Sequence, residues 1–75
     1  MKNGVLIYNK DLQRMDIQFA GGKYYGGLHC GECFDVLINN KWFPTRIEYG
    51  ISNNNGWYLI DVDKHIDLQG LKVRK

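Results

Sequence analysis

Turn-forming residues interrupt this 75-residue chain at short intervals, and no stretch between them keeps the 3.6-residue period of a helix over three turns. The stretches that remain are short and rich in β-branched and aromatic residues. Residues 14–19, RMDIQF, alternate strictly between polar and apolar, which is typical of a strand with one buried face. The sequence therefore predicts an all-β protein.

Glycine and asparagine pairs mark where the predicted strands reverse. Gly21-Gly22 and Asn39-Asn40 are typical of tight hairpins, because both residue types tolerate a positive φ. A third turn is predicted at 53–56, and residues 66–70 are long enough for one helical turn. Seven segments are candidates for the five or six expected strands: 4–8, 14–19, 23–25, 34–38, 41–49, 57–62 and 71–73.

Five or six short strands in so short a chain, with one 3-10 turn before the last strand, predict a small SH3-like β-barrel. An OB-like barrel usually needs more residues and a helix. Residues 1–75 form one expected domain. A chain of this length buries only about 60% of its unfolded surface, so the core is expected to be thin.

Charge and hydropathy argue against several classes of protein. The net charge is only +2 and comes mostly from Lys72, Arg74 and Lys75, which does not favour a dedicated duplex-binding protein. No apolar run approaches the ~20 residues of a membrane span. The polar residues 9–11 interrupt the N-terminal apolar stretch, unlike a signal peptide, so a cytoplasmic location is expected.

The stretch LHCGECFDV, residues 28–36, carries both cysteines of the chain in a C-x-x-C pattern. This spacing allows Cys30 and Cys33 to bind one zinc ion across a tight turn. Zinc needs four ligands, and His65 and His29 are the candidates for the others. A nearby carboxylate or a second chain is the alternative source. The sequence thus predicts a structural zinc site.

Two other roles for these cysteines stay open. Free cysteine behaves as a small hydrophobic residue, so Cys30 and Cys33 are alternatively two buried, inert thiols. A redox pair is the least favoured role, because a thioredoxin-like C-x-x-C precedes a helix that lowers the thiol pKa, whereas a strand is predicted at 34–38.

Hydrolytic chemistry is not favoured either. Asp61, Asp63, His65 and Asp67 crowd one predicted loop, but no nucleophile motif accompanies them, and the only serine, Ser52, lies in a polar turn. A solvated acidic loop is the simpler interpretation. No phosphate-binding or dinucleotide-binding glycine motif is present. The protein is therefore predicted to be a non-enzyme.

Aromatic residues are expected on the face opposite the inward apolar stripe, close in sequence to basic residues. Trp, Tyr and Arg dominate the energetic centres of protein interfaces, and aromatic rings also stack on single-stranded nucleic acid. Alternatively, one or both tryptophans cover the open end of the barrel. The predicted partner-binding residues are Trp42, Arg46, Trp57, Tyr24 and Tyr25.

Three stretches, YYGGLHCGECF, KWFPTRIE and LQGLKVR, resemble a small uncharacterised domain family of Firmicutes and of their phages and mobile elements. The resemblance covers nearly the whole chain and implies a small cytoplasmic protein of the kind that mobile elements carry. It implies no chemistry, because the family has no established activity.

These observations together predict a small non-enzymatic binding protein that a structural zinc ion stabilises. Its expected role is to dock on a host protein and inhibit it, as an anti-CRISPR protein does with a CRISPR nuclease. The alternative is a nucleic-acid-binding barrel module, which salt-dependent binding would reveal.

Overall fold

The computed structural model describes residues 1–75 and contains six strands and one 3-10 turn, with no α-helix. All strand pairs are antiparallel and form one sheet in the order β2-β1-β6-β3-β4-β5. This confirms the all-β prediction. The elements are β1 (Asn3–Asn9), β2 (Arg14–Phe19), β3 (Cys33–Ile38), β4 (Lys41–Tyr49), the 3-10 turn (Asn54–Gly56), β5 (Trp57–Leu59) and β6 (Lys72–Arg74).

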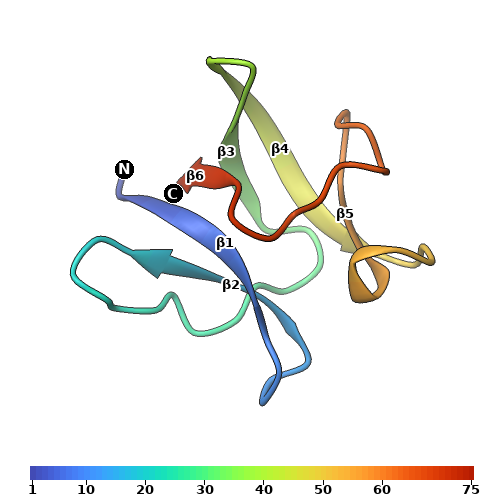
Figure 1. Ribbon diagram of the computed structural model, residues 1–75, viewed down its shortest axis with the longest axis horizontal. Helices are drawn as coiled ribbons and strands as arrows, with labels where there is room; N and C mark the ends of the chain where they lie inside the picture. The colour runs from blue at the N-terminus through green and yellow to red at the C-terminus, as the bar shows by residue number, and fades with distance from the viewer.

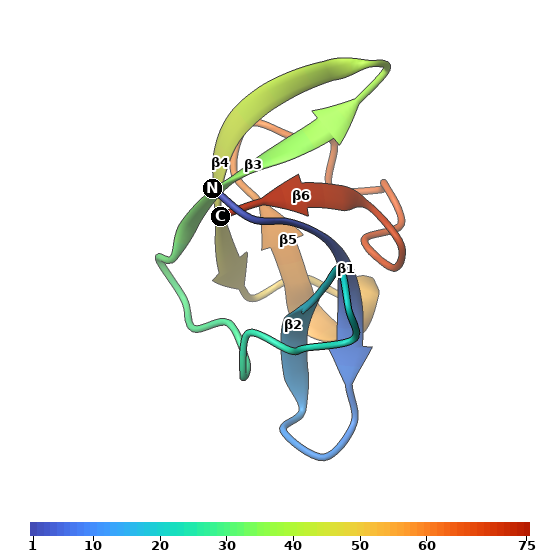
Figure 2. The same cartoon turned by 90° about the vertical axis from the view of Figure 1, so that its left-hand side faces the viewer.

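The sheet consists of the β1–β2 and β3–β4 hairpins, joined through the short strand β6, and of β5 at the edge beside β4 (Figure 1). β6 pairs with β1 on one side and with β3 on the other. The sheet curves strongly between the two hairpins and gives a small barrel-like domain (Figure 2). The chain ends lie side by side, because Lys2 and Lys75 exchange backbone hydrogen bonds of 2.8 and 2.9 Å.

The concave side of this sheet holds one hydrophobic core. Alternate residues of a strand point to the same face, so the inward positions of all six strands meet there. Leu28 and Leu68, from two long connections, close the core. The buried apolar residues are Leu6, Met15, Ile17, Leu28, Phe34, Val36, Ile47, Trp57, Leu59, Leu68 and Val73.

The hairpin turn at Asn39 and Asn40 has the conformation that the sequence predicted. Their φ angles are +52° and +63°, the pair of positive values that a two-residue type I′ turn needs. The turn joins β3 to β4 in the register Ile38 to Lys41. The predicted strands at 14–19 and 41–49 also match β2 and β4 residue for residue.

Residues 23–25 do not form the predicted strand. Segment 23–28, which we call the covering segment, runs along the outer edge of β2 and is held there by backbone hydrogen bonds from Tyr25 to Ile17 and from Leu28 to Met15, both 2.8 Å. The adjacent glycines Gly26 and Gly27, with φ of +111° and +99°, interrupt the ladder between these contacts. The segment therefore covers β2 without joining the sheet as a strand.

The structure also revises the end of the chain. β5 stops at Leu59, short of the predicted residue 62, because the chain turns away through Asp61 at a φ of +61°. The only 3-10 turn lies at Asn54–Gly56, earlier than the predicted 66–70. At 66–68, the Asn54 side chain donates to the Ile66 carbonyl at 2.8 Å and accepts from the Leu68 N–H at 3.2 Å, so these two backbone groups bind a distant side chain.

The structure holds no helix that is long and apolar enough to cross a lipid bilayer.

Candidate binding face

The convex side of β3, β4 and β6 carries a mixture of aromatic, apolar and charged side chains. These positions alternate with the buried residues of the same strands, so they point outward. We call this surface the outer face. Its residues are Cys33, Asp35 and Leu37 of β3, Trp42, Pro44 and Arg46 of β4, and Lys72 and Arg74 of β6.

Trp42, Arg74 and Asp35 form the centre of the outer face. The Arg74 guanidinium lies over the Trp42 ring, 4.3 Å from its centroid, and its Nε donates to Asp35 Oδ2 at 2.9 Å. Both the arginine and the tryptophan are half-buried. A guanidinium stacks on an aromatic face while its edge binds a carboxylate, so each partner restricts the other's rotamers. The unit is therefore held in one arrangement before any partner binds.

Proline at position 44 is compatible with β4 because this part of the strand has no neighbour on its other side. β5 pairs only with Ile47–Tyr49, so residues 41–44 form a free edge. A proline on an edge strand removes a donor to which another strand would pair. The edge of β4 beside the outer face is therefore unpaired, and Pro44 protects it against the addition of another strand.

Arg46 lies at the other end of the outer face and is exposed. Its Nε donates to Glu48 Oε2 at 2.9 Å. It lines a shallow depression of about 210 Å³ with Cys33, Pro44, Thr45, Ile60 and Asp61. The outer face is therefore concave beside Arg46.

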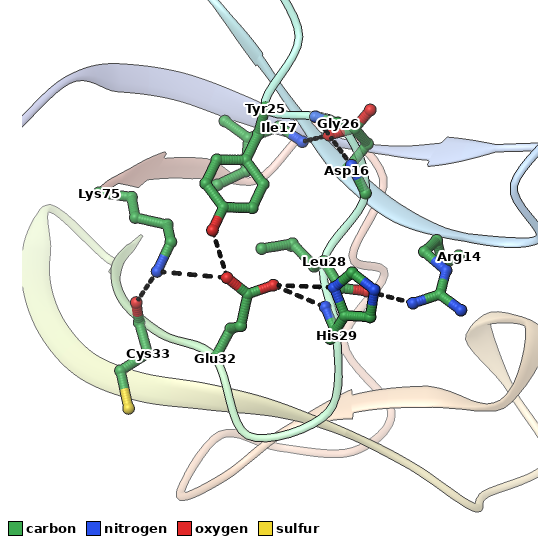
Figure 3. Close-up of polar contacts among 11 residues, drawn as sticks. Arg14, Asp16, Ile17, Tyr25, Gly26, Leu28, His29, Glu32, Cys33 and Lys75 are labelled. Carbon is green, nitrogen blue, oxygen red and sulfur yellow. Dashed lines mark hydrogen bonds and ion pairs between the residues drawn. The ribbon is translucent and has the colours of Figure 1, made fainter.

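A cluster around Glu32 adjoins the Cys33 end of the outer face (Figure 3). Tyr25 donates its hydroxyl hydrogen bond to Oε1 of Glu32, and the backbone N–H of His29 donates to Oε2 at 2.7 Å. Lys75 Nζ lies 3.9 Å from Oε1, donates to the Cys33 carbonyl at 2.7 Å and lies 5.4 Å from the Tyr25 ring centroid. The last residue of the chain thus fixes Tyr25 beside the outer face.

The contacts of this cluster shift two pKa values in opposite directions. Partial burial alone would raise the pKa of Glu32, but the hydrogen bonds from Tyr25 and His29 and the charge of Lys75 outweigh it and hold this pKa below its ordinary value. The hydrogen bond to Glu32 raises the pKa of Tyr25, with smaller contributions from burial and from the carboxylate charge. Near neutral pH, Glu32 is therefore ionised and Tyr25 is a neutral donor.

Asp16 anchors the covering segment from below (Figure 3). Its side chain is 1% exposed, and its Oδ1 accepts backbone hydrogen bonds from Ile17 at 2.8 Å and from Gly26 and Gly27 at 2.9 Å. Three N–H groups that the interrupted ladder leaves unpaired are satisfied by one carboxylate. This contact fixes the path of the chain into the C-x-x-C stretch.

The C-x-x-C stretch is a turn followed by a β-bulge. The Glu32 N–H donates to the His29 carbonyl at 3.1 Å, which closes a β-turn with Cys30 and Gly31 at its centre. Gly31 then donates to the Ile47 carbonyl at 2.8 Å, and the Ile47 N–H donates to the Glu32 carbonyl at 3.1 Å. With a φ of +88° at Gly31, this is the G1 bulge, which favours glycine for conformational reasons.

Both cysteines are exposed free thiols, so the alternative that they are buried in the core is wrong. The physical reason is the turn: its central residues protrude, and Cys33 then takes an outward position of β3. Cys33 Sγ lies 3.6 Å from the Gly31 carbonyl.

The predicted zinc ligands are not all brought together. His29 Nδ1 lies 3.5 Å from Glu32 Oε2, with its side chain 72% exposed. His65 lies in the separate loop at 60–66, where its N–H donates to Asp63 Oδ1 at 2.9 Å. No group of three or more His, Cys, Asp or Glu side chains is close enough to hold a metal ion. Zinc binding by Cys30 and Cys33 stays a prediction.

The predicted aromatic patch divides into three locations. Trp57 is only 5% exposed and belongs to the core, where its ring meets Tyr49 edge-on with centroids 4.9 Å apart, so its assignment to an exposed face is wrong. Trp42 lies on the outer face. Tyr24 and Tyr25 lie on the covering segment and are 56% and 40% exposed. Trp57 is buried because β5 turns that side chain toward the concave side.

Sequence reasoning placed only Trp42 and Arg46 of the outer face among the partner-binding residues. The face also holds Asp35, Leu37, Pro44, Lys72 and Arg74, and Arg74 makes the contact that orders Trp42. One signal was present: in the segment LKVRK, charged residues alternate with Val73, which is typical of an amphipathic strand. The pairing of that strand with β3 is a tertiary fact that no local pattern contains.

Comparisons with known proteins agree with this fold. A family model described as "Domain of unknown function (DUF5348)" matches residues 4–75. A crystal structure of a protein from Ruminococcus gnavus is similar, with a TM-score of 0.84 and 44% sequence identity over 99% of this chain and 100% of that chain. No curated protein matches this chain. The matched descriptions name no activity.

Proposed function

The chain belongs to the DUF5348 family, a family of domains of unknown function, and from this premise we propose that it is a non-enzymatic binding protein that docks on a partner protein through its outer face. The observation that carries the proposal is the Trp42–Arg74–Asp35 unit. Tryptophan and arginine are the residue types that contribute most to protein interfaces. A unit that is already ordered loses little rotamer entropy when a partner covers it.

The charge balance of the outer face favours a protein partner over nucleic acid. Arg74 is paired with Asp35, Arg46 with Glu48, and Lys75 lies 3.9 Å from Glu32. Cations that are already neutralised gain less from phosphates than free ones, because a carboxylate must first be displaced or repelled. Lys72 is the exposed cation of the face that forms no ion pair.

The resemblance to a family of Firmicutes and of their phages and mobile elements extends the proposal to the identity of the partner. In its most specific form, the protein acts in the cytoplasm and inhibits a host defence nuclease such as a CRISPR effector. This extension depends on the resemblance alone, whereas the docking proposal depends on the outer face.

Quantitative affinity capture from a host lysate tests the docking proposal. The wild type and Trp42→Ala are compared, with Tyr49→Ala as the matched control, because Tyr49 is an exposed aromatic of the same strand on the opposite face, 60% exposed. We expect the Trp42→Ala variant to lose at least about tenfold of a specific partner, as a hot-spot residue does, and the control to retain it. Equal capture by all three proteins contradicts the role of the outer face.

The salt dependence of binding distinguishes protein docking from the alternative function, a nucleic-acid-binding module. A labelled single-stranded oligonucleotide is titrated with the protein at about 50 and about 200 mM salt, a range over which phosphate-dominated binding falls steeply. Tight binding at about 50 mM salt that falls steeply at about 200 mM, and that is lost in the Trp42→Ala variant, would favour nucleic acid over protein.

Zinc enters the proposal as a structural ion bound by Cys30 and Cys33, with His29, His65 or a second chain completing the site. Bound zinc would hold the C-x-x-C turn through charge and ligand geometry. Native mass spectrometry of the untagged protein, with and without a chelator, measures it directly. A mass increase of one zinc ion that disappears on chelation supports the site, and a metal-free folded monomer contradicts it.

A further inference from the structure

A second surface lies on the inner side of the β3–β4 hairpin, where this hairpin extends past the buried core (Figures 1 and 2). Phe43 points inward like Thr45 and Ile47 but is 44% exposed, because nothing fills the space in front of it. The loop at 60–66 forms the opposite wall. The resulting hollow measures about 180 Å³ and is lined by Ile38, Phe43, Asp61, Val62, Asp63 and Ile66.

The rim of this hollow carries negative charge that the protein itself does not neutralise. Neither Asp61 nor Asp63 forms an ion pair. Lys64, the cation of the same loop, lies over the Tyr58 ring, 5.0 Å from its centroid. Arg46, which shares the neighbouring depression with Asp61, is paired with Glu48. A cationic ligand would therefore meet two carboxylates without displacing a cation.

The size and lining of the hollow restrict what it can hold. Pockets for small-molecule ligands usually measure about 300–1,000 Å³, so this smaller hollow suits a single amino-acid side chain. Its apolar lining consists of the aliphatic groups of Ile38, Val62 and Ile66 and the aromatic ring of Phe43, whereas its charges are on the exposed residues Asp61 and Asp63. A matching side chain has an apolar stem and a cationic end.

We propose that the hollow binds an arginine side chain of a partner polypeptide. The three methylene groups of arginine would pack against the apolar wall, as they do when long basic side chains cover apolar surface. The planar guanidinium can stack on the Phe43 ring and direct its donors to Asp61 and Asp63. Arginine fits better than lysine because lysine has neither the planar surface nor the fork of donors.

This inference does not depend on the outer face, since Phe43 and Trp42 point to opposite sides of β4. The test is an NMR titration of the ¹⁵N-labelled protein with the blocked tripeptide acetyl-Ala-Arg-Ala-amide. The matched control is the same peptide with citrulline in place of arginine, which keeps the stem and the planar head but removes the charge. The Trp42→Ala variant should bind the arginine peptide as the wild type does.

We expect saturable shifts confined to the amides around residues 38, 43 and 61–66, with a dissociation constant on the order of 1 mM for so small a ligand. The citrulline peptide should bind at least about tenfold more weakly. The double variant Asp61→Asn with Asp63→Asn should reduce arginine binding to the citrulline level. Asn tolerates the left-handed conformation of Asp61, whose φ is +61°, so this variant should remain folded.

Asp67→Asn controls for the loss of one negative charge outside the hollow, because Asp67 lies near this loop but does not line the hollow. The inference is overturned if the arginine and citrulline peptides bind equally, or if Asp67→Asn weakens binding as much as the double variant. Shifts that do not saturate, or that spread over the acidic groups of the whole surface, also overturn it.

Discussion

The β1–β2 and β3–β4 hairpins have the same antiparallel architecture, but the protein covers only the first of them. The difference is clearest in two aspartates, each in the middle of a strand and each directed away from the core. Asp16 of β2 is 1% exposed under the covering segment and binds three backbone N–H groups. Asp35 of β3 is half-buried and binds the Arg74 side chain instead.

The comparison shows that an outward-pointing polar residue does not by itself make a binding surface. In the first hairpin, the long connection from β2 to β3 returns over the strand and uses the carboxylate as a structural acceptor (Figure 3). In the second hairpin, the tight Asn39-Asn40 turn leaves no chain to cover the outer face, and the inner side is open beside Phe43. Both surfaces that we propose for binding therefore belong to β3 and β4.

Removing the carboxylate of Asp16 should have the largest effect on stability. Asp16→Ala leaves three backbone donors without an acceptor, two of them buried and that of Gly26 partly buried, so we expect the free energy of unfolding to fall by about 3 kcal/mol or more. Asp35→Ala, which removes a partly exposed ion pair, should cost about 1 kcal/mol or less. Urea denaturation followed by tryptophan fluorescence measures both. Equal losses would mean that the two hairpins do not differ as described.

A side chain at Gly4 tests how closely the covered hairpin is packed. A Cβ atom there would lie 2.7 Å from the Gln18 carbonyl oxygen and from Ile17 Cγ2, so β1 must move away from β2. We expect Gly4→Ala to lower stability by about 1–3 kcal/mol, as overpacking does. Val5→Ala is a local control, because Val5 points outward from the same strand. A Gly4→Ala variant as stable as the wild type would show that β1 is free to shift.

Trp42→Ala should affect the open hairpin much less. The substitution removes the contact with Arg74 and some partly buried surface, but the Arg74–Asp35 pair remains. The expected loss is about 1 kcal/mol, consistent with an exposed cation–π contact together with modest burial. Thermal unfolding monitored by circular dichroism checks this. Complete unfolding would mean that Trp42 supports the core, and the capture experiment would then need a milder substitution such as Trp42→Leu.

The smallest expected effect is a pH dependence from Glu32, at the border between the two hairpins. Because its pKa in the folded protein lies below its unfolded value of 4.5, its contribution is fully present above that pH and is lost as the pH falls through the folded pKa. Glu32→Gln should therefore lower the melting temperature most at about pH 6–7 and least at about pH 3. A difference that does not change with pH would assign the role of Glu32 to packing.

Local patterns in the sequence predicted the strands because their causes are local. Alternation placed β2 and β4 correctly, and two asparagines with positive φ specified the turn between β3 and β4. The same alternation predicted that Trp42 and Arg46 point outward. The prediction of an exposed side chain was wrong for Trp57. Alternation assigns the residues of a strand to two opposite faces, but it does not say which face the rest of the chain buries.

The sequence by itself determined the all-β class, most strand positions and the hairpin turn at Asn39. It also supplied, at Gly31, the residue type that adopts the positive φ of the bulge most easily. Each follows from the conformational preferences of a few adjacent residues. Only the tertiary structure decided that Asp16 is buried, that Arg74 stacks on Trp42 across 32 residues, and that a hollow opens beside Phe43. These contacts join distant segments, and strand order and the path of the long connections determine which distant segments meet.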